Sequence, residues 1–377
     1  MTKIAIIDAD LIGRKRHRFP NLACMKLSGY WKGQGADVVL KTDFTGLSKF
    51  DQVFISKVFT DTPVPEDVLS LPNVQHGGTG FFYDKAAPLP DEVEHHMPDY
   101  HLYDLWVERQ LSAGGKARDF IYYTDYSIGF LTRGCFRKCS FCVNQNYDRV
   151  FAHSPLSEFF DPERPKICLL DDNFLGHPNW KGLLTDLQQT QRPFQFKQGL
   201  DERLLTDEKC AALFSSKYDG DFIFAFDDAA DSALIEQKLQ LARKHTNAVL
   251  KFYCFCGYDR AGAWDADFWK RDIFELLFRI AMLMRYRCLP YVMRYARYSG
   301  SPYRGMYITL ARWCNQPSFF KKKSLWEFAE SNGRNSACFR YVDEFVSQFP
   351  EALPFNNLKF GTEQVRCDTP YGSEFTD

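Results

Sequence analysis

The sequence predicts an α/β protein with a small Rossmann-like N-terminal unit, a core of six parallel strands and an aromatic-rich C-terminal extension. Its 377 residues, 45% of them hydrophobic, allow about two domains or one large barrel with a sizeable core. Between residues 126 and 295, short apolar runs alternate with segments of helical length, as in parallel sheets joined by crossover helices. A formal charge of −1 argues against a strongly basic nucleic-acid coat protein.

The Rossmann-like unit is predicted at residues 1–83. Strands are expected at 3–7, 37–40, 52–57 and 73–75. Apolar residues at near-helical spacing follow the first strand, and Gly33 and Gly35 supply stop signals for that helix. Residues 84–120 are rich in proline, histidine and acidic groups, so we expect a linker and packing arm there.

The core is predicted at residues 121–298. Its strands are expected at 127–132, 167–171, 194–198, 222–226, 250–255 and 290–294, and its helices at 179–189, 206–215, 232–245 and 267–284. Such a sheet is open or partly closed as a barrel, and its active site is expected at the carboxyl ends of the strands. The extension at 299–377, with a predicted helix around 325–349, is expected to cover the open side of the sheet.

Three of the 12 cysteines, Cys135, Cys139 and Cys142, follow the first core strand at spacings typical of a metal site. The sequence shows neither a signal peptide nor a membrane-spanning stretch, so we expect a cytoplasmic protein with reduced thiols. Three thiolates so spaced can bind three corners of one iron–sulfur cubane and leave its fourth iron open to a chelating ligand. Two alternatives stay open: a structural zinc ion, for which His153 is the only nearby imidazole, and a chance trio of buried cysteines.

With Phe141 directly before the last cysteine, this Cys-x3-Cys-x2-Cys motif resembles that of the radical S-adenosylmethionine superfamily. The resemblance covers roughly residues 120–295 and implies a partial (β/α)6 parallel barrel of that type. It implies that the three cysteines hold a 4Fe–4S cluster and that S-adenosylmethionine binds the open iron. Reductive cleavage would then yield a 5′-deoxyadenosyl radical that abstracts hydrogen from an unidentified substrate, which is a metabolite, peptide, lipid or tRNA. A one-electron donor such as flavodoxin or ferredoxin is implied as a partner.

The resemblance also implies which residues contact S-adenosylmethionine. Acceptors for its ammonium group are expected in the turn after the second core strand, at Asp171, Asp172 and Asn173. Further contacts are expected from the motif aromatic and from the ends of the later strands, namely Phe141, Gln198, Asp201, Arg203, Asp227 and Gly257. Two structural alternatives stay open: a helix N-cap in the turn at 171–173, and an ion pair between Asp201 and Arg203.

The N-terminal unit resembles the cobalamin-binding-like domain of one branch of the superfamily, through its strand–loop–helix at 3–35 and its run Gly77-Gly78-Thr79-Gly80. The Asp-x-His-x-x-Gly pattern that supplies an imidazole in that domain is absent, because no histidine follows Asp8 and Asp10 before His17. The sequence therefore leaves bound cobalamin open but disfavours it. Nucleic acid is likewise left open but not favoured as a partner, since the net charge is near zero.

A function of another class is a non-catalytic iron–sulfur or zinc protein that acts as a redox sensor or scaffold. The remaining cysteines show no ligand spacing, and most are expected to be buried thiols. A second cluster that draws on Cys314, Cys338 and Cys367 is disfavoured for the same reason.

Overall fold

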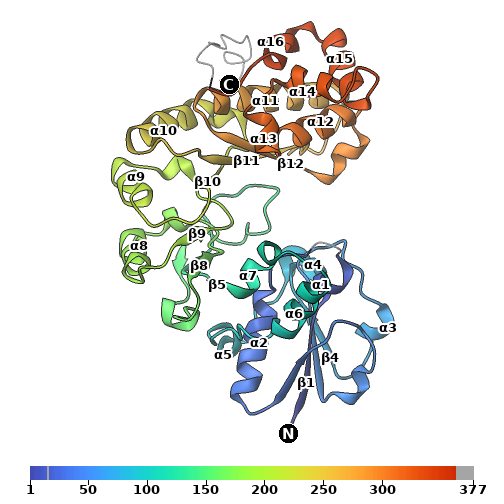
Figure 1. Ribbon diagram of the computed structural model, residues 1–377, viewed down its shortest axis with the longest axis vertical. Helices are drawn as coiled ribbons and strands as arrows, with labels where there is room; N and C mark the ends of the chain where they lie inside the picture. The colour runs from blue at the N-terminus through green and yellow to red at the C-terminus, as the bar shows by residue number, and fades with distance from the viewer. Residues whose placement is uncertain (15–16, 362–377) are drawn as a thin grey trace. The chain divides into compact units, whose positions relative to one another are not determined.

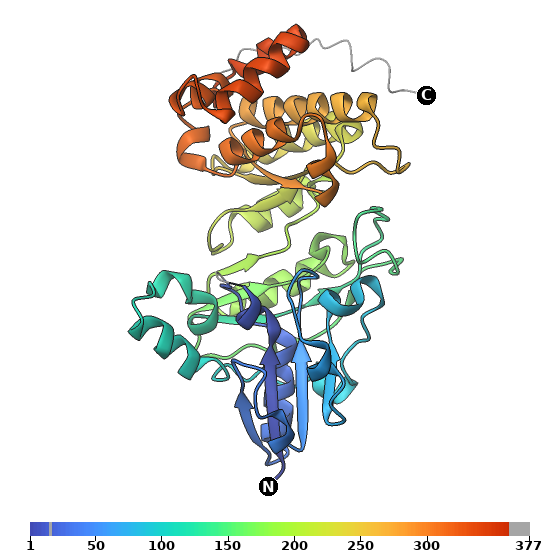
Figure 2. The ribbon, with the colours of Figure 1, turned by 90° about the vertical axis from the view of Figure 1, so that its right-hand side faces the viewer.

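The computed structural model describes residues 1–14 and 17–361 (Figures 1 and 2). The chain divides into two compact units, Met1–Lys197 and Gln198–Asp377. The predicted core range of 121–298 extends over both units, and the four predicted domain ranges stay a prediction. No helix in the described ranges is long and apolar enough to cross a bilayer.

The predicted N-terminal sheet is present. Its strands are parallel in the order β2-β1-β3-β4, with bounds Lys3–Asp8 for β1, Asp37–Leu40 for β2, Gln52–Ser56 for β3 and Val74–Gly77 for β4 (Figure 1). Ile4 and Ile6 pack on the same side as helix α2 (Leu22–Gly33), while Ala5 and Ile7 belong to the apolar cluster on the other side. This alternation is what a strand buried on both faces requires. Three short helices follow the strands: α1 (Ala9–Gly13), α3 (Glu66–Leu69) and α4 (Thr79–Phe82).

The segment at 84–120 packs on the α2 side of this sheet. It contains α5 (Asp91–Glu94) and α6 (Asp104–Ser112), and α7 (Ile121–Thr124) follows it. Its buried apolar side chains join the cluster of Ile4 and Ile6; they are Val93, Tyr100, Leu102, Tyr103, Val107 and Phe120.

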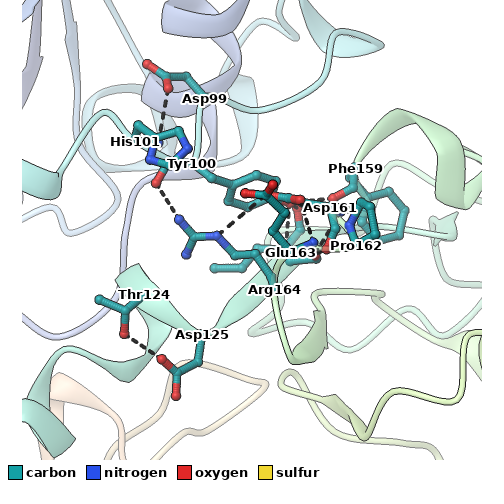
Figure 3. A network of polar contacts seen from close by, with 12 residues as sticks. Asp99, Tyr100, His101, Thr124, Asp125, Phe159, Asp161, Pro162, Glu163 and Arg164 are labelled. Atoms are coloured by element: carbon teal, nitrogen blue, oxygen red, sulfur yellow. Dashed lines mark hydrogen bonds and ion pairs between the residues drawn. The ribbon is translucent and has the colours of Figure 1, made fainter.

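Tyr100 and Arg164 connect this arm to the first core sheet (Figure 3). The Tyr100 hydroxyl accepts from the main-chain N–H of Ile128 at 2.8 Å. The guanidinium of Arg164 donates to the carbonyls of Tyr123 and Tyr100, each at 2.6 Å, and lies 4.7 Å from the Tyr100 ring centroid. Arg164 is only 6% exposed, so these carbonyls depend on it for a buried partner.

The first core sheet has the parallel order β5-β8-β9, formed by Tyr126–Gly129, Lys166–Leu169 and Phe194–Phe196. Helix α8 (Trp180–Gln189) joins β8 to β9. The prediction of one strand over 127–132 is wrong: β5 ends at Gly129, and Thr132–Arg133 forms β6, which pairs antiparallel with β7 (Phe151–Ala152). The reason is that the carboxylate of Asp171 accepts from the N–H groups of Leu131 and Thr132, in place of a neighbouring strand.

The second core sheet has the parallel order β10-β11-β12, formed by Ile223–Ala225, Lys251–Cys256 and Leu289–Arg294. The predicted helices are present as α9 (Asp207–Phe214), α10 (Ser232–His245) and α11 (Ala266–Arg285). All six predicted core strands therefore exist, in two three-stranded sheets. Within residues 1–14 and 17–361 they form no closed barrel, so the partial barrel stays a prediction.

Up to residue 361, the C-terminal extension contains helices that lie on one side of β11 and β12 (Figures 1 and 2). They are α12 (Arg304–Cys314), α13 (Pro317–Phe320), α14 (Leu325–Ser331), α15 (Ala337–Gln348) and α16 (Leu353–Asn356). The single helix predicted around 325–349 is wrong, because Gly333 has a φ of +93° and Ser336 caps a new helix. Asn315 exchanges two hydrogen bonds with the main chain of Val292, at 2.7 and 3.0 Å, and so satisfies the edge of β12.

We expect Arg164→Leu to destabilise the first unit by about 3 kcal/mol, because it leaves two buried carbonyls without their charged donor. Urea unfolding of the full chain, followed by tryptophan fluorescence, measures this loss. The matched control is Arg192→Leu, whose one bond to the Pro162 carbonyl is exposed and should cost less than about 0.5 kcal/mol. Equal unfolding midpoints for the two variants would contradict the role given to Arg164.

Candidate metal centre

The three motif cysteines lie in the loop between β6 and β7, at residues 134–150. Gly134 opens the loop with a φ of +83°, and a Cβ there would lie 2.5 Å from the Arg149 carbonyl oxygen. Cys142 N–H donates to the Cys139 carbonyl at 2.9 Å, so these two cysteines share one turn. Cys135, Cys139 and Cys142 are all partly exposed. The loop thus offers its thiols near the surface rather than in the apolar core.

Three N–H groups donate to sulfur atoms of the motif. Arg137 N–H donates to Cys135 Sγ at 3.3 Å, and Asn144 N–H to Cys142 Sγ at 3.4 Å. The side-chain amide of Asn173, in the turn after β8, donates through Nδ2 to Cys135 Sγ at 3.3 Å. Hydrogen bonds of this kind stabilise a thiolate and a metal-bound sulfur. The donor set therefore fits a thiolate-ligated metal cluster.

Asp172 ties the two ends of the motif together. Its carboxylate accepts from Gly134 N–H at 2.8 Å and from Asn144 Nδ2 at 2.7 Å, and the Arg133 guanidinium lies 3.7 Å away. Gly134 precedes the first motif cysteine and Asn144 follows the last by two positions. The carboxylate therefore holds the motif at both ends. Its predicted contact with S-adenosylmethionine stays a prediction.

Asp171 and Asn173, on either side of Asp172, differ in whether their side-chain oxygens have hydrogen-bond donors. Asp171 is 1% exposed and accepts from Leu131 N–H, Thr132 N–H and the Thr132 hydroxyl. Burial raises the pKa of Asp171 to about 7, although these hydrogen bonds oppose that rise. Asn173 is 3% exposed, and within the described residues its Oδ1 is buried without a hydrogen-bond donor. A buried acceptor of this kind is costly unless another group supplies a donor.

No group of three or more His, Cys, Asp or Glu side chains in the described ranges is arranged to hold a single metal ion. In a 4Fe–4S cluster each cysteine binds a different iron, so its ligands do not converge on one point. His153 is engaged by its own surroundings: Nδ1 lies 3.0 Å from Ser154 Oγ and Nε2 lies 3.5 Å from Glu94 Oε1.

The other described cysteines are buried, as predicted. Burial raises the pKa of Cys254 and of Cys288 to about 12, so both stay protonated thiols at neutral pH. Cys314 and Cys338 are buried as well, and Cys367 lies outside the described residues.

The remaining predicted contacts belong to the second unit. Arg203 Nε donates to Asp201 at 2.7 Å and Arg203 Nη1 to Asp231 at 2.7 Å, so the structural ion pair left open by the sequence is present. Asp227 accepts from Phe255 N–H at 2.8 Å, and burial raises the pKa of Asp227. Gln198 is exposed. Gly257 has a φ of +78°, which favours glycine, and its N–H donates to Asp272 at 2.8 Å.

Sequence reasoning missed two buried ionisable groups of the second unit. The Arg279 guanidinium is 2% exposed and donates to the carbonyls of Phe226 and Phe255, at 2.7 and 3.0 Å, where β10 and β11 end. Glu202 is also 2% exposed; its Oε2 accepts from Ala225 N–H at 3.2 Å, and its Oε1 has no partner in the described chain. A lone arginine within an apolar helical run was the available signal for Arg279.

No protein-family model matches the sequence, and no curated protein matches it. Among solved structures, the radical S-adenosylmethionine methyltransferase TsrM from Kitasatospora setae, with cobalamin and a 4Fe–4S cluster bound, is similar over 74% of this chain and 70% of that one, with 11% identity and a TM-score of 0.47. The cobalamin-dependent S-adenosylmethionine radical enzyme OxsB in its apo form is similar over 78% of this chain and 49% of that one, with 12% identity and a TM-score of 0.36. With aqua-cobalamin bound, OxsB is similar over 93% of this chain and 56% of that one, with 12% identity and a TM-score of 0.35. This chain thus spans about half the length of OxsB. Because these likenesses are distant, the assignment of a function depends on this chain's own residues.

We expect Gly134→Ala to displace the start of the motif loop, because the added Cβ would meet the Arg149 carbonyl at 2.5 Å and the Phe151 ring at 3.0 Å. The variant should lose most of the iron that the native chain binds on anaerobic reconstitution, measured as iron per chain. Gly114→Ala is the matched control. Gly114 has a φ of +90°, but a Cβ there would meet no atom within 4 Å, so the substitution costs only the strain of a left-handed alanine, about 1–2 kcal/mol. Equal iron content in both variants would contradict the role of Gly134.

A second prediction concerns the pH dependence of stability. Burial raises the pKa of Glu202 from 4.5 to about 8, so the folded chain keeps a proton that the unfolded chain releases. Stability contributed by this group therefore falls as the pH rises from 4.5 to about 8, by at most about 1.4 kcal/mol per pH unit. Glu202→Gln should remove this decline.

Urea unfolding at several pH values between 5 and 8 measures the effect. Glu208→Gln, at an exposed glutamate of α9, serves as the control and should keep the native pH profile. Parallel profiles for the native chain and Glu202→Gln would show that Glu202 is already ionised in the folded chain.

Proposed function

We propose that this chain is a radical S-adenosylmethionine enzyme in which Cys135, Cys139 and Cys142 bind three irons of a 4Fe–4S cluster. The observation that carries the proposal is the set of three N–H donors to Cys135 and Cys142, in a loop whose cysteine motif is held at both ends by Asp172. Such donors offset the negative charge that thiolate ligands bring to a cluster. With three protein ligands, the fourth iron is left for an exchangeable ligand, in the way that catalytic metal sites keep an open position.

S-adenosylmethionine is the proposed ligand of that iron, and Asn173 is the favoured acceptor for its ammonium group. Asp171 already accepts three hydrogen bonds from the chain, and Asp172 accepts two. Asn173 Oδ1 is the buried acceptor of this turn that lacks a donor within the described residues. An ammonium group supplies such a donor.

When bound, the cluster and S-adenosylmethionine supply one-electron cleavage to a carbon radical, and the chain supplies binding, orientation and exclusion of water. Phe141 lies between two motif cysteines and is proposed to contribute to that shielding. In the second unit, Gln198 and Gly257 are proposed as further contacts. Three more proposed contacts already have hydrogen-bond partners within the chain, so they would have to exchange these partners to bind S-adenosylmethionine; they are Asp201, Arg203 and Asp227.

Zinc is the weaker candidate for this site. A closed zinc site needs a fourth ligand. The nearby imidazole of His153 instead faces Ser154 and Glu94. A redox sensor or scaffold with a full cluster would likewise need a fourth ligand for the open iron, which this loop does not supply through cysteine.

Cobalamin is not part of the proposal. A parallel sheet of this order binds ligands at the carboxyl ends of β1 and β3, where the strand order reverses. There Asp8 is fully buried and accepts from the Tyr103 hydroxyl at 2.9 Å, and His17 Nε2 lies 3.4 Å from the same carboxylate. The imidazole thus faces a carboxylate of its own chain. The TsrM structure and one of the OxsB structures contain cobalamin, but their likeness to this chain is distant.

Anaerobic reconstitution with iron and sulfide tests the proposal. The native chain should take up about four irons and absorb at about 400 nm. With dithionite and S-adenosylmethionine it should release 5′-deoxyadenosine. Cys139→Ala should lose the absorbance and the release together, because one corner of the cluster loses its thiolate. Cys338→Ala, at a buried cysteine of α15, is the control and should keep both.

Each outcome separates the candidates. A full cluster with intact S-adenosylmethionine would favour the non-catalytic protein. Zinc in place of iron, retained after Cys139→Ala, would overturn the ligand assignment altogether.

A further inference from the structure

Asn173 differs from the two main-chain donors to the motif sulfurs because it hydrogen-bonds to Cys135 through its side chain. The other two donors, Arg137 N–H and Asn144 N–H, belong to the main chain and follow the course of the loop. Asn173 instead reaches Cys135 Sγ from the turn after β8, 38 positions along the chain. This contact can therefore be changed by substitution without altering the loop itself.

The Asn173 side chain is held firmly. The side chain is 3% exposed, and a Cβ on Gly176 would lie 3.4 Å from its amide carbon; the main-chain carbonyl of Asn173 accepts from Gly176 N–H at 3.0 Å, which fixes the backbone that carries the side chain. A thiolate has only acceptor character, so Nδ2 must face Cys135 and Oδ1 must point away from it. The buried Oδ1 without a partner in the described chain agrees with that orientation.

An N–H dipole aimed at a ligand sulfur stabilises the more negative, reduced state of a cluster. The effect is strong where the donor is buried, because water does not screen it. An exposed donor at the same distance would contribute less.

We propose that Asn173 is a positioning residue that sets the reduction potential of the cluster through its hydrogen bond to Cys135. This inference rests on the proposed function, since it requires a cluster on the three cysteines. The reduced state takes one electron from an external donor, which is dithionite in the experiment below. Removal of the amide N–H makes that reduction harder.

The experiment compares the native chain with Asn173→Leu and Asn173→Asp, both close to asparagine in size. Asn146→Ala is the matched control: Asn146 is an exposed asparagine of the same loop whose amide contacts the Asp84 carbonyl, not a sulfur. Iron content and the absorbance at about 400 nm are measured first, so that only chains with a cluster are compared. Dithionite titration followed by electron paramagnetic resonance then gives the potential.

Both Asn173 variants should hold about tenfold less reduced cluster at a given ambient potential, a shift of about 59 mV for a one-electron couple. Asn146→Ala should titrate like the native chain. A full cluster with an unchanged potential in both Asn173 variants would overturn the inference and leave the proposed function standing. Absence of a cluster from the native chain would overturn the proposed function instead. If Asn173→Leu does not fold, Asn173→Ala takes its place, because it also removes the amide N–H and adds no charge.

Discussion

Two adjacent carboxylates determine how the chain leaves the first core strand and enters the cysteine loop. Asp171 accepts from the N–H groups of Leu131 and Thr132, which lie just beyond the end of β5. Asp172 then binds Gly134 and Asn144. Because a buried N–H without a partner costs about 1–3 kcal/mol, the loop follows the path on which the turn after β8 satisfies these groups. The positions of the motif cysteines therefore depend on the turn that follows a neighbouring strand.

Each unit also contains a buried guanidinium that satisfies main-chain carbonyls near strand ends. Arg164 serves the carbonyls of Tyr100 and Tyr123 in the first unit. In the second unit, the Arg279 guanidinium donates to the carbonyls of Phe226 and Phe255. Phe226 directly precedes Asp227, and Phe255 directly precedes Cys256, where β11 ends. The planar group has several donors in a fixed arrangement, so one side chain can fix two segments at once. Polar residues that follow these strands are thereby held in defined positions.

The sequence was sufficient for the elements whose apolar pattern is strong, and insufficient where side chains replace regular hydrogen bonds. The predicted helix at 232–245 matches α10, because its apolar residues recur at helical spacing. The breaks at Gly129 and Gly333 were missed, since each depends on a local backbone conformation or a distant carboxylate. In the site, spacing indicated the three cysteines. The contact between Asn173 and Cys135, across 38 positions, leaves no periodic trace in a sequence.

The motif loop also constrains how the charge of a cluster is balanced. Lys138 stands between the first two cysteines, but its ammonium binds the carbonyls of Gln145 and Tyr147, at 2.8 and 2.6 Å, and Asp148 at 2.7 Å. The Lys138 ammonium thus binds the later part of the loop, at residues 145–148. The sulfurs of Cys135 and Cys142 receive neutral N–H dipoles instead. Dipoles stabilise a thiolate without adding a full positive charge, so these two sulfurs are stabilised without a direct contact from the Lys138 ammonium.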